Sequence, residues 1–145
     1  MRLLIFLCFG LFGQFLMAEE KFLSLKKSKV NVRYGPSFDS KIKYIYKKIN
    51  LPIKQIDQKE NFRRIVDLKN NSGWIHISQV KKSNSIIILE DKILYKKPSN
   101  FSKPIAKLEK GRLLILKKCE NIWCNVKTED YSGWVKTENI WGSVN

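Results

Sequence analysis

An internal repeat constrains this chain more than any other feature of its sequence. The same landmarks occur in the same order in both halves: a Pro-Ser pair, a Ser-Lys pair, an aromatic residue and a Ser-Gly-Trp triplet. These landmarks pair as Pro36 with Pro98, Ser40 with Ser102, Phe62 with Trp123, and Gly73 with Gly133. The spacing falls only from 62 residues at the prolines to 60 at the glycines, which two one-residue deletions in loops explain. A repeated order of this kind indicates one structural unit that is present twice.

Each unit is predicted to consist of short β-strands separated by turns. Apolar and β-branched residues form short runs between turn-forming residues, with little sign of an amphipathic helix. The candidate strands are 30–33, 44–48, 52–57, 62–67 and 74–77 in the first unit, and 86–89, 105–108, 113–118, 123–128 and 134–136 in the second. The segments 70–73 and 129–133 are predicted hairpin turns in which the glycine supplies a positive φ. Strands this short and numerous predict a small barrel that closes on itself and so hides its edges.

The N-terminus has the pattern of a secretory signal peptide. Met1 and Arg2 precede an apolar stretch over 3–16, and a small residue, Ala18, stands just before an acidic pair at 19–20. The apolar stretch is shorter than the about 20 residues that cross a bilayer. We therefore expect cleavage after Ala18 and a periplasmic or secreted product. An uncleaved N-terminal anchor is the alternative.

The predicted organisation follows from the signal and the repeat. It comprises a signal peptide (1–18), an N-terminal lead (19–27), a first domain (28–80), a linker (81–85) and a second domain (86–145). No later apolar run reaches membrane length, so no transmembrane segment is expected in the processed chain.

Two cysteines remain after the predicted cleavage, because Cys8 leaves with the signal peptide. Cys119 and Cys124 flank a four-residue connection between two predicted strands. Hairpin partners at such positions stand about 5 Å apart at their Cα atoms, within reach of a disulfide. An oxidising compartment favours that bond. A redox-active pair is the alternative, although such pairs usually have the tighter Cys-x-x-Cys spacing.

The charge of the chain favours anionic partners. It has 28 Lys and Arg against 13 Asp and Glu, a net charge of +15, which attracts nucleic acid, anionic lipid or acidic wall polymers. Of the basic residues 23 are Lys and only five are Arg, in a chain rich in Ile and Asn, so a background bias in residue usage is an equal alternative. The basic residues are spread over both units, which disfavours a nucleic-acid-binding arm.

The sequence contains no set of residues that predicts catalysis, a metal or a cofactor. His76 is the only histidine, and its repeat counterpart is Lys136, so the position is expected to be solvated. Zinc sites need about three or four ligands, and a Cys/His hydrolase needs a cysteine beside a histidine in a dedicated domain. Paired carboxylates in an apolar setting and a phosphate-binding glycine loop are also missing from the sequence. We therefore expect a non-enzymatic protein.

The sequence resembles the bacterial SH3-like (SH3b) domain. The resemblance rests on the phrase Val30-Asn31-Val32-Arg33 followed by Gly35-Pro36-Ser37, and on the Gly-Trp-Ile/Val signature near the end of each unit. It extends to exported bacterial proteins with two such domains through Leu51-Pro52-Ile53, Phe62-Arg63-Arg64-Ile65, the cysteine pair and Trp141-Gly142. The resemblance implies an all-β fold of two small SH3-like β-barrels in tandem, an envelope location, and binding of the cell wall or a peptide.

Ligand-binding candidates lie mainly in the loop after the first strand, where aromatic and charged residues occur together. They are Arg33, Tyr34, Phe38, Trp74 and His76 in the first unit, and Tyr95, Lys97, Phe101 and Tyr131 in the second. The tryptophans are also expected to pack one end of each barrel, and the other aromatics could equally anchor their loops. Peptidoglycan, or its peptide or anionic elements, is the predicted ligand. A periplasmic adaptor that docks protein partners is the alternative.

The first unit is expected to be the stronger binder. It keeps the phrase Asn31-x-Arg33-x-Gly35-Pro36, whereas the second unit has Leu94-Tyr95-Lys96-Lys97-Pro98 in its place.

The signal peptide leads to a direct prediction about the processed protein. Protein recovered from the cell envelope should have an intact mass that begins at Glu19, because a signal with this pattern is cut after its small residue. Mass spectrometry of the purified protein measures this. Recovery of a chain that still contains residues 1–18 would contradict cleavage.

Overall fold

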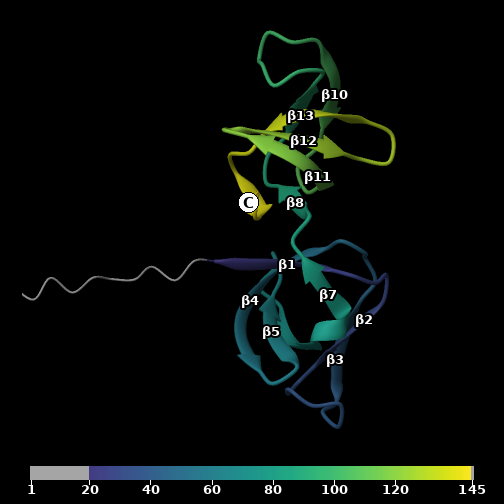
Figure 1. The fold of residues 1–145 in the computed structure, drawn as a ribbon. Helices are drawn as coiled ribbons and strands as arrows, with labels where there is room; N and C mark the ends of the chain where they lie inside the picture. The colour runs from purple at the N-terminus through teal and green to yellow at the C-terminus, as the bar shows by residue number, and fades with distance from the viewer. Residues whose placement is uncertain (1–19, 145) are drawn as a thin grey trace, which may run out of the picture.

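The computed structural model describes residues 20–144 and contains two antiparallel sheets that follow one another along the chain (Figure 1). The first sheet contains β1 (Lys21–Leu25), β2 (Val30–Arg33), β3 (Ile42–Tyr46), β4 (Pro52–Lys59), β5 (Phe62–Val66), β6 (Ser72–His76) and β7 (Val80–Lys82), with the 3₁₀ helix η1 (Ile77–Gln79) before β7. The second contains β8 (Ser85–Ile88), β9 (Lys92–Tyr95), β10 (Pro104–Leu108), β11 (Leu113–Glu120), β12 (Trp123–Lys127), β13 (Ser132–Lys136) and β14 (Ile140–Gly142). The predicted signal peptide lies outside the described residues.

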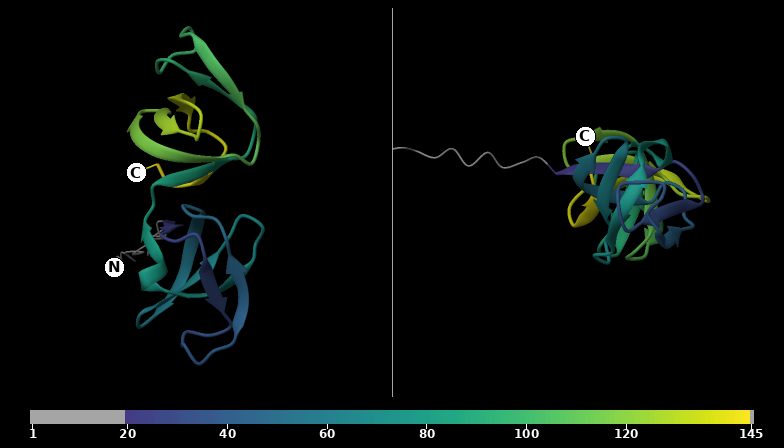
Figure 2. Two further views of the ribbon diagram at one scale, coloured as in Figure 1. Left: turned by 90° about the vertical axis from the view of Figure 1, so that its right-hand side faces the viewer. Right: turned by 90° about the horizontal axis from the view of Figure 1, so that it is seen from below.

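The two sheets share one topology, which confirms the predicted duplication and the all-β fold. The strand order is β3-β2-β6-β5-β4-β1-β7 in the first sheet and β10-β9-β13-β12-β11-β8-β14 in the second. Adding seven to each strand number in the first order gives the second order. The prediction that each barrel closes on itself is wrong. The two end strands of the first sheet, β3 and β7, are not hydrogen-bonded to each other, and neither are β10 and β14 in the second sheet. Each sheet coils around its core as an open sheet (Figure 2).

Four strands were not predicted from the sequence. β1 lies in the segment 19–27 that was predicted to be a lead, and β7, β9 and β14 were also not predicted. By topology, β8 corresponds to β1 and β9 to β2, which agrees with the predicted pairing of Pro36 with Pro98. β9 was hidden by Lys92, which reads as polar but is only 7% exposed. Its ammonium group donates hydrogen bonds to Glu138 O at 2.6 Å and Glu90 Oε1 at 3.2 Å.

Each sheet wraps a small apolar core supplied by alternate residues of its strands. In β2 the buried residues are Val30 and Val32, so Asn31 and Arg33 face outward. The first core consists of Leu25, Val30, Val32, Ile53, Ile65 and Ile75, and the second of Ile86, Ile88, Leu94, Leu108, Leu114, Cys124, Val126 and Val135. Because the period of a strand is two, the residues between these core positions form the outer surface of each domain.

The glycines of the two Ser-Gly-Trp triplets act by close packing and not by a positive φ, which corrects the expectation from the sequence. A Cβ on Gly73 would lie 2.4 Å from Val32 Cγ1, and one on Gly133 would lie 2.6 Å from Tyr95 O. These glycines let β6 and β13 pass directly against β2 and β9. The positive φ of the first turn belongs to Asn70, at 65°.

The tryptophans of these triplets are not part of the core, so that expectation is wrong. Gly73 and Ile75 are buried, and alternation therefore turns Trp74 outward, where it is half-buried. Trp134 is placed in the same way in β13, beside the buried Val135.

The domains are joined by a chain of hydrogen bonds in a buried seam. Ser24 and Ser85 are both 0% exposed, and their hydroxyl oxygens lie 2.8 Å apart. Asn84 N–H donates to Ser24 Oγ, and Ser85 Oγ donates to Asn50 O. Ser24 therefore donates its own proton to Ser85, and the chain runs in one direction across both domains. The connection between the sheets is only two residues long, Ser83 and Asn84.

Trp141 of the second domain makes a further contact with the first domain. The indole N–H of Trp141 donates to Pro52 O at 2.9 Å, and its ring packs edge-on against Phe22 with centroids 5.1 Å apart. Figure 2 shows the two sheets stacked end to end along one axis. The relative placement of the domains is thus set by specific contacts as well as by a short connection.

Trp141→Phe should lower the free energy of unfolding by about 1 kcal/mol, because it deletes one hydrogen bond and keeps an aromatic ring beside Phe22. Urea denaturation followed by circular dichroism measures the change. Trp134→Phe is the matched control, since Trp134 is half-buried and its indole forms no hydrogen bond within residues 20–144. An equal loss in both variants would mean that the bond to Pro52 contributes nothing.

The disulfide predicted from the sequence is present. Cys119 and Cys124 are bonded and face each other in the β11–β12 hairpin, with Cα atoms 4.0 Å apart. Cys124 belongs to the core of the second domain, whereas Cys119 is half-buried. The bond therefore ties the hairpin to the core of its own domain.

Removing this bond should destabilise the protein by about 2 kcal/mol, the loop-closure contribution of a ring this short. The double substitution Cys119→Ala and Cys124→Ala tests it by urea denaturation. Treatment of the unsubstituted protein with a thiol reductant should cause a loss of similar size. An unfolding midpoint that does not respond to the reductant would contradict the stabilising role.

Candidate functional site

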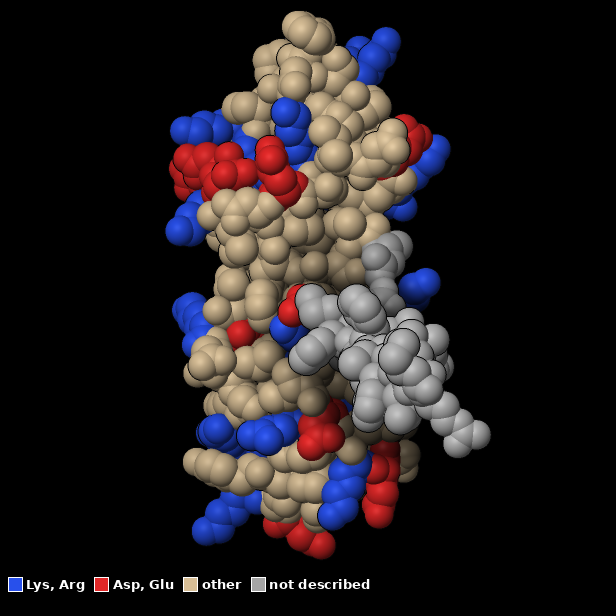
Figure 3. All heavy atoms as spheres, turned by 90° about the vertical axis from the view of Figure 1, so that its left-hand side faces the viewer, with Lys and Arg blue, Asp and Glu red and all other residues tan. Residues whose placement is uncertain are grey.

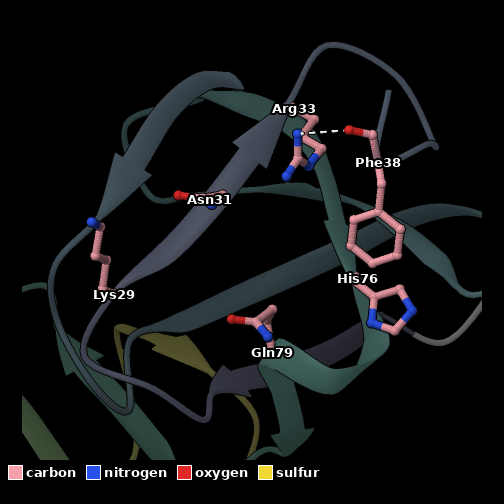
Figure 4. Close-up of a pocket in the computed structure, with 6 residues that line it drawn as sticks. All are labelled: Lys29, Asn31, Arg33, Phe38, His76 and Gln79. Atoms are coloured by element: carbon pink, nitrogen blue, oxygen red, sulfur yellow. Dashed lines mark hydrogen bonds between the residues drawn. The ribbon is translucent and has the colours of Figure 1, made fainter. Parts of the chain in front are cut away.

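A groove of about 300 Å³ opens on the outer surface of the first domain, next to β2, β6 and η1 (Figure 4). Its lining residues are Lys29, Asn31, Arg33, Phe38, His76 and Gln79. They come from three separate parts of the chain: β2 with the residue before it, the β2–β3 loop, and the end of β6 with η1. The groove is large enough for one short peptide segment or a comparable small group.

One side of the groove is polar and cationic because of the alternation in β2. Asn31 and Arg33 are the outward residues of this strand, and Lys29 precedes it in the same phase. The three side chains therefore form a row along one strand. Figure 4 shows Lys29 and Asn31 across the opening from Phe38 and His76.

The opposite side is aromatic: Phe38 and His76 line it, and both of their rings contact the buried ring of Phe62. The Phe38 ring lies 4.9 Å from the His76 ring and 5.2 Å from the Phe62 ring, and His76 lies 5.2 Å from Phe62. Phe62 is buried and faces His76 directly in the β5–β6 ladder. The rings of Phe38 and His76 both pack against it. His76 is thus half-buried and stacked, so the interpretation of its position as simply solvated is wrong.

His76 is oriented by the short helix that follows it. Its Nδ1 accepts the backbone N–H of Ser78 at 3.2 Å and lies 2.8 Å from Ser78 Oγ. Because Nδ1 is an acceptor, the neutral ring carries its proton on Nε2.

Arg33 connects the two sides of the groove. Its Nη1 donates to Phe38 O at 3.2 Å and to Ser40 O at 2.9 Å, and its guanidinium carbon stands 5.7 Å from the centroid of the Phe38 ring. These contacts hold the β2–β3 loop over the groove. Within residues 20–144 its Nε and Nη2 atoms form no hydrogen bond, so this guanidinium keeps donors for a ligand.

The structure brings together three of the five residues predicted in the first domain: Arg33, Phe38 and His76. Tyr34 is separate, with Lys43 Nζ 5.6 Å from its ring centroid. Trp74 pairs with Arg33 in the ladder but does not line the groove.

Three lining residues were missed by the sequence analysis. Lys29 and Asn31 could have been found from the alternation with the apolar residues at 30 and 32, which places 29, 31 and 33 on one outer face. Gln79 lies in η1 and reaches the groove only through the tertiary fold, so no local signal marks it.

The equivalent face of the second domain has different chemistry. The topology and the repeat place Asp91, Ile93 and Tyr95 where the first domain has Lys29, Asn31 and Arg33, and place Asn100 and Lys136 where it has Phe38 and His76. Tyr95 instead packs against Trp123, with centroids 5.7 Å apart, and Lys136 Nζ lies 5.7 Å from the centroid of the same ring. This face has neither the cationic row nor the three-ring contact.

The residues predicted as ligand candidates in the second domain do not line one common site. Lys97 and Phe101 line an open hollow on the β9–β10 loop together with Lys96, Ser99, Ser102 and Lys103. Tyr95 does not line this hollow. Tyr131 lies in the β12–β13 turn, where its N–H donates to Thr128 Oγ1 at 3.0 Å.

Charge is distributed over both domains. Figure 3 shows Lys and Arg side chains on the faces of both, with acidic residues among them. Within residues 20–144 no three His, Cys, Asp or Glu side chains gather closely enough to hold a metal ion. The same residues contain no helix of the length and hydropathy needed to cross a membrane.

Comparison with known proteins agrees with the duplicated fold. The sequence model of a family described as bacterial SH3 domain matches this chain twice, at residues 26–82 and 91–142. No curated protein sequence matches the chain.

Two solved structures of limited similarity are NlpC2 and NlpC1 from Trichomonas vaginalis, with sequence identities of 10% and 9% and TM-scores of 0.40 and 0.38. The matches cover 86% and 84% of this chain but only 49% and 45% of those chains. This chain thus spans about half the length of these structures.

Proposed function

Because this chain belongs to the bacterial SH3 domain family, whose members are typically cell-wall binding modules, we propose that it is a non-catalytic binding module of the cell envelope that recognises peptidoglycan through its peptide and anionic groups. The observation that carries this proposal is the groove of the first domain. It combines a cationic row with an aromatic side in one opening of suitable size.

The lining residues match the chemistry of a short anionic peptide. Lys29 and Arg33 supply positive charge for a carboxylate, and the guanidinium has the geometry for a bidentate contact. The amides of Asn31 and Gln79 offer donors and acceptors for peptide groups. The Phe38 ring gives an apolar surface for a side chain or an aliphatic stem. Peptidoglycan carries peptides with free carboxylates, which present all three kinds of group.

Binding of this kind requires no chemical step from the protein. His76 is held by Ser78 and by two rings, which suits a positioning role against a bound ligand. The remaining lining groups are two cations, two amides and a phenyl ring, and these bind without forming or breaking bonds.

An envelope location forms part of the proposal. We propose that the chain is exported with cleavage after Ala18 and works in the periplasm or outside the cell. The Cys119–Cys124 disulfide supports this, because such bonds persist in oxidising compartments and are rare in the cytosol.

Phe38→Ala should weaken binding to purified murein by about 1 to 3 kcal/mol, roughly 5-fold to 150-fold, as expected for the loss of an aromatic contact in a binding site. Tyr34→Ala is the matched control: Tyr34 belongs to the same loop and is 66% exposed against 64% for Phe38, but it lies outside the groove. Co-sedimentation of the processed protein with murein measures both affinities. Circular dichroism verifies that each variant is folded.

Two outcomes would contradict the groove as the binding site. One is murein binding by Phe38→Ala that equals binding by the unsubstituted protein. The other is equal weakening in both variants, because Tyr34 does not line the groove. Competition with free wall peptides and with peptide-free glycan strands shows which part of the polymer is bound, and the proposal requires that the peptides compete.

A further inference from the structure

The β9–β10 loop of the second domain is built on the same backbone as the β2–β3 loop of the first. In both loops the ends are joined by one backbone hydrogen bond, from Tyr34 N to Lys41 O and from Lys96 N to Lys103 O. The internal turns also match: Ser40 N donates to Ser37 O, and Ser102 N donates to Ser99 O. The two loops therefore hold their corresponding residues in the same places.

The residue at the tip differs in kind between these two loops. The backbone N–H of Asp39 donates to Ser37 Oγ at 3.0 Å, and that of Phe101 donates to Ser99 Oγ at 3.1 Å, so Phe101 occupies the position of Asp39. The aromatic Phe38, which packs over the groove, is replaced by Asn100. The second domain thus places a phenyl ring where the first places an exposed carboxylate.

Phe101 is 101% exposed, the highest value among the exposed large apolar residues. Its backbone is held by the turn hydrogen bonds, so the fold presents this ring to the outside. A fully exposed phenyl ring is unfavourable in water, since about 25 cal/mol are gained for each Å² of apolar surface that is covered. A partner that covers it would recover this free energy.

The other residues that line the hollow beside Phe101 are lysines and serines. Lys96, Lys97 and Lys103 line the same hollow, and the ion pairs of residues 20–144 do not involve them. The sequence has no Asp or Glu from residue 92 to residue 108. The charge of the loop therefore selects an anionic partner.

The loop projects from the end of the second domain that points away from the first domain (Figure 1). The hollow on this loop is wider open to the outside than the groove of the first domain. A bilayer interface can surround an exposed ring on a projecting loop without a preformed pocket. Aromatic residues with neighbouring lysines are the usual composition of surfaces that rest in the headgroup region of a bilayer.

We propose that the β9–β10 loop is a site of contact with an anionic lipid bilayer. Phe101 enters the boundary between headgroups and acyl chains, and Lys96, Lys97 and Lys103 lie among the phosphate groups of the surface. Each lysine near an anionic membrane strengthens binding, and one inserted ring adds an apolar contribution. Both contributions are modest, so this contact is reversible.

The test is co-sedimentation of the processed protein with vesicles of phosphatidylcholine alone and of phosphatidylcholine with about one third phosphatidylglycerol. We expect partitioning into the anionic vesicles at least about tenfold above that into neutral ones. Phe101→Ala should reduce it by about tenfold, the effect of withdrawing one ring from an apolar environment. Phe101→Trp should retain it, because Trp is preferred at membrane interfaces. The double variant Lys96→Gln and Lys97→Gln should lose about thirtyfold, about fivefold for each lysine.

Phe38→Ala is the matched control, because it removes a partly exposed phenyl ring from the equivalent loop of the first domain, and it should leave vesicle binding unchanged. Equal binding to neutral and anionic vesicles would overturn the proposal, and so would an unchanged affinity of Phe101→Ala for the anionic ones. A loss of murein binding in Phe101→Ala with no loss of vesicle binding would assign the loop to a wall polymer instead. The groove is tested separately, by Phe38→Ala on murein.

Discussion

The buried seam between the domains is the constraint on which the arrangement of this protein depends. Each domain has only about 60 residues, a size at which a single core gives limited stability. The hydroxyls of Ser24 and Ser85 are fully buried, and a buried polar group without a partner is costly. The relay from Asn84 through both serines to Asn50 O satisfies them only when the domains stand in one relative position. The seam therefore fixes the directions in which the two outer surfaces face.

Duplication has kept the backbone of the two domains and changed their surfaces. Strand order, turn hydrogen bonds and the close-packed glycines occur in both. The outward residues of one strand differ: Asn31 and Arg33 in β2 correspond to Ile93 and Tyr95 in β9. Since outward residues contribute little to the core, they can change without loss of the fold. The first domain thus has a groove with a cationic side, and the second has a basic loop with an exposed phenyl ring.

Much of the fold could be predicted from local patterns. The repeat, the central strands of each sheet and the disulfide hairpin follow from residue spacing, alternation and turn chemistry. The strands β7 and β14 could not be predicted because each has only three residues, and β1 could not because its partners β4 and β7 lie far away in sequence. Trp74 was assigned to the core on its size, although the neighbouring buried residues Gly73 and Ile75 turn it outward. A large aromatic residue near a turn does not show which face it takes until the register is known.

The sequence by itself determined that the chain is a duplicated all-β protein, and it identified Arg33, Phe38 and His76 as candidates for one site. Only the tertiary structure decided that these three meet, that Tyr34 and Trp74 stand apart, and that Gln79 completes the lining. The physical reason is the range of the forces involved. Alternation and turn preference act between residues a few positions apart, and they appear directly in the sequence. The groove depends on how a coiled sheet brings β2 against β6 and η1, although 38 residues of chain separate β2 from β6.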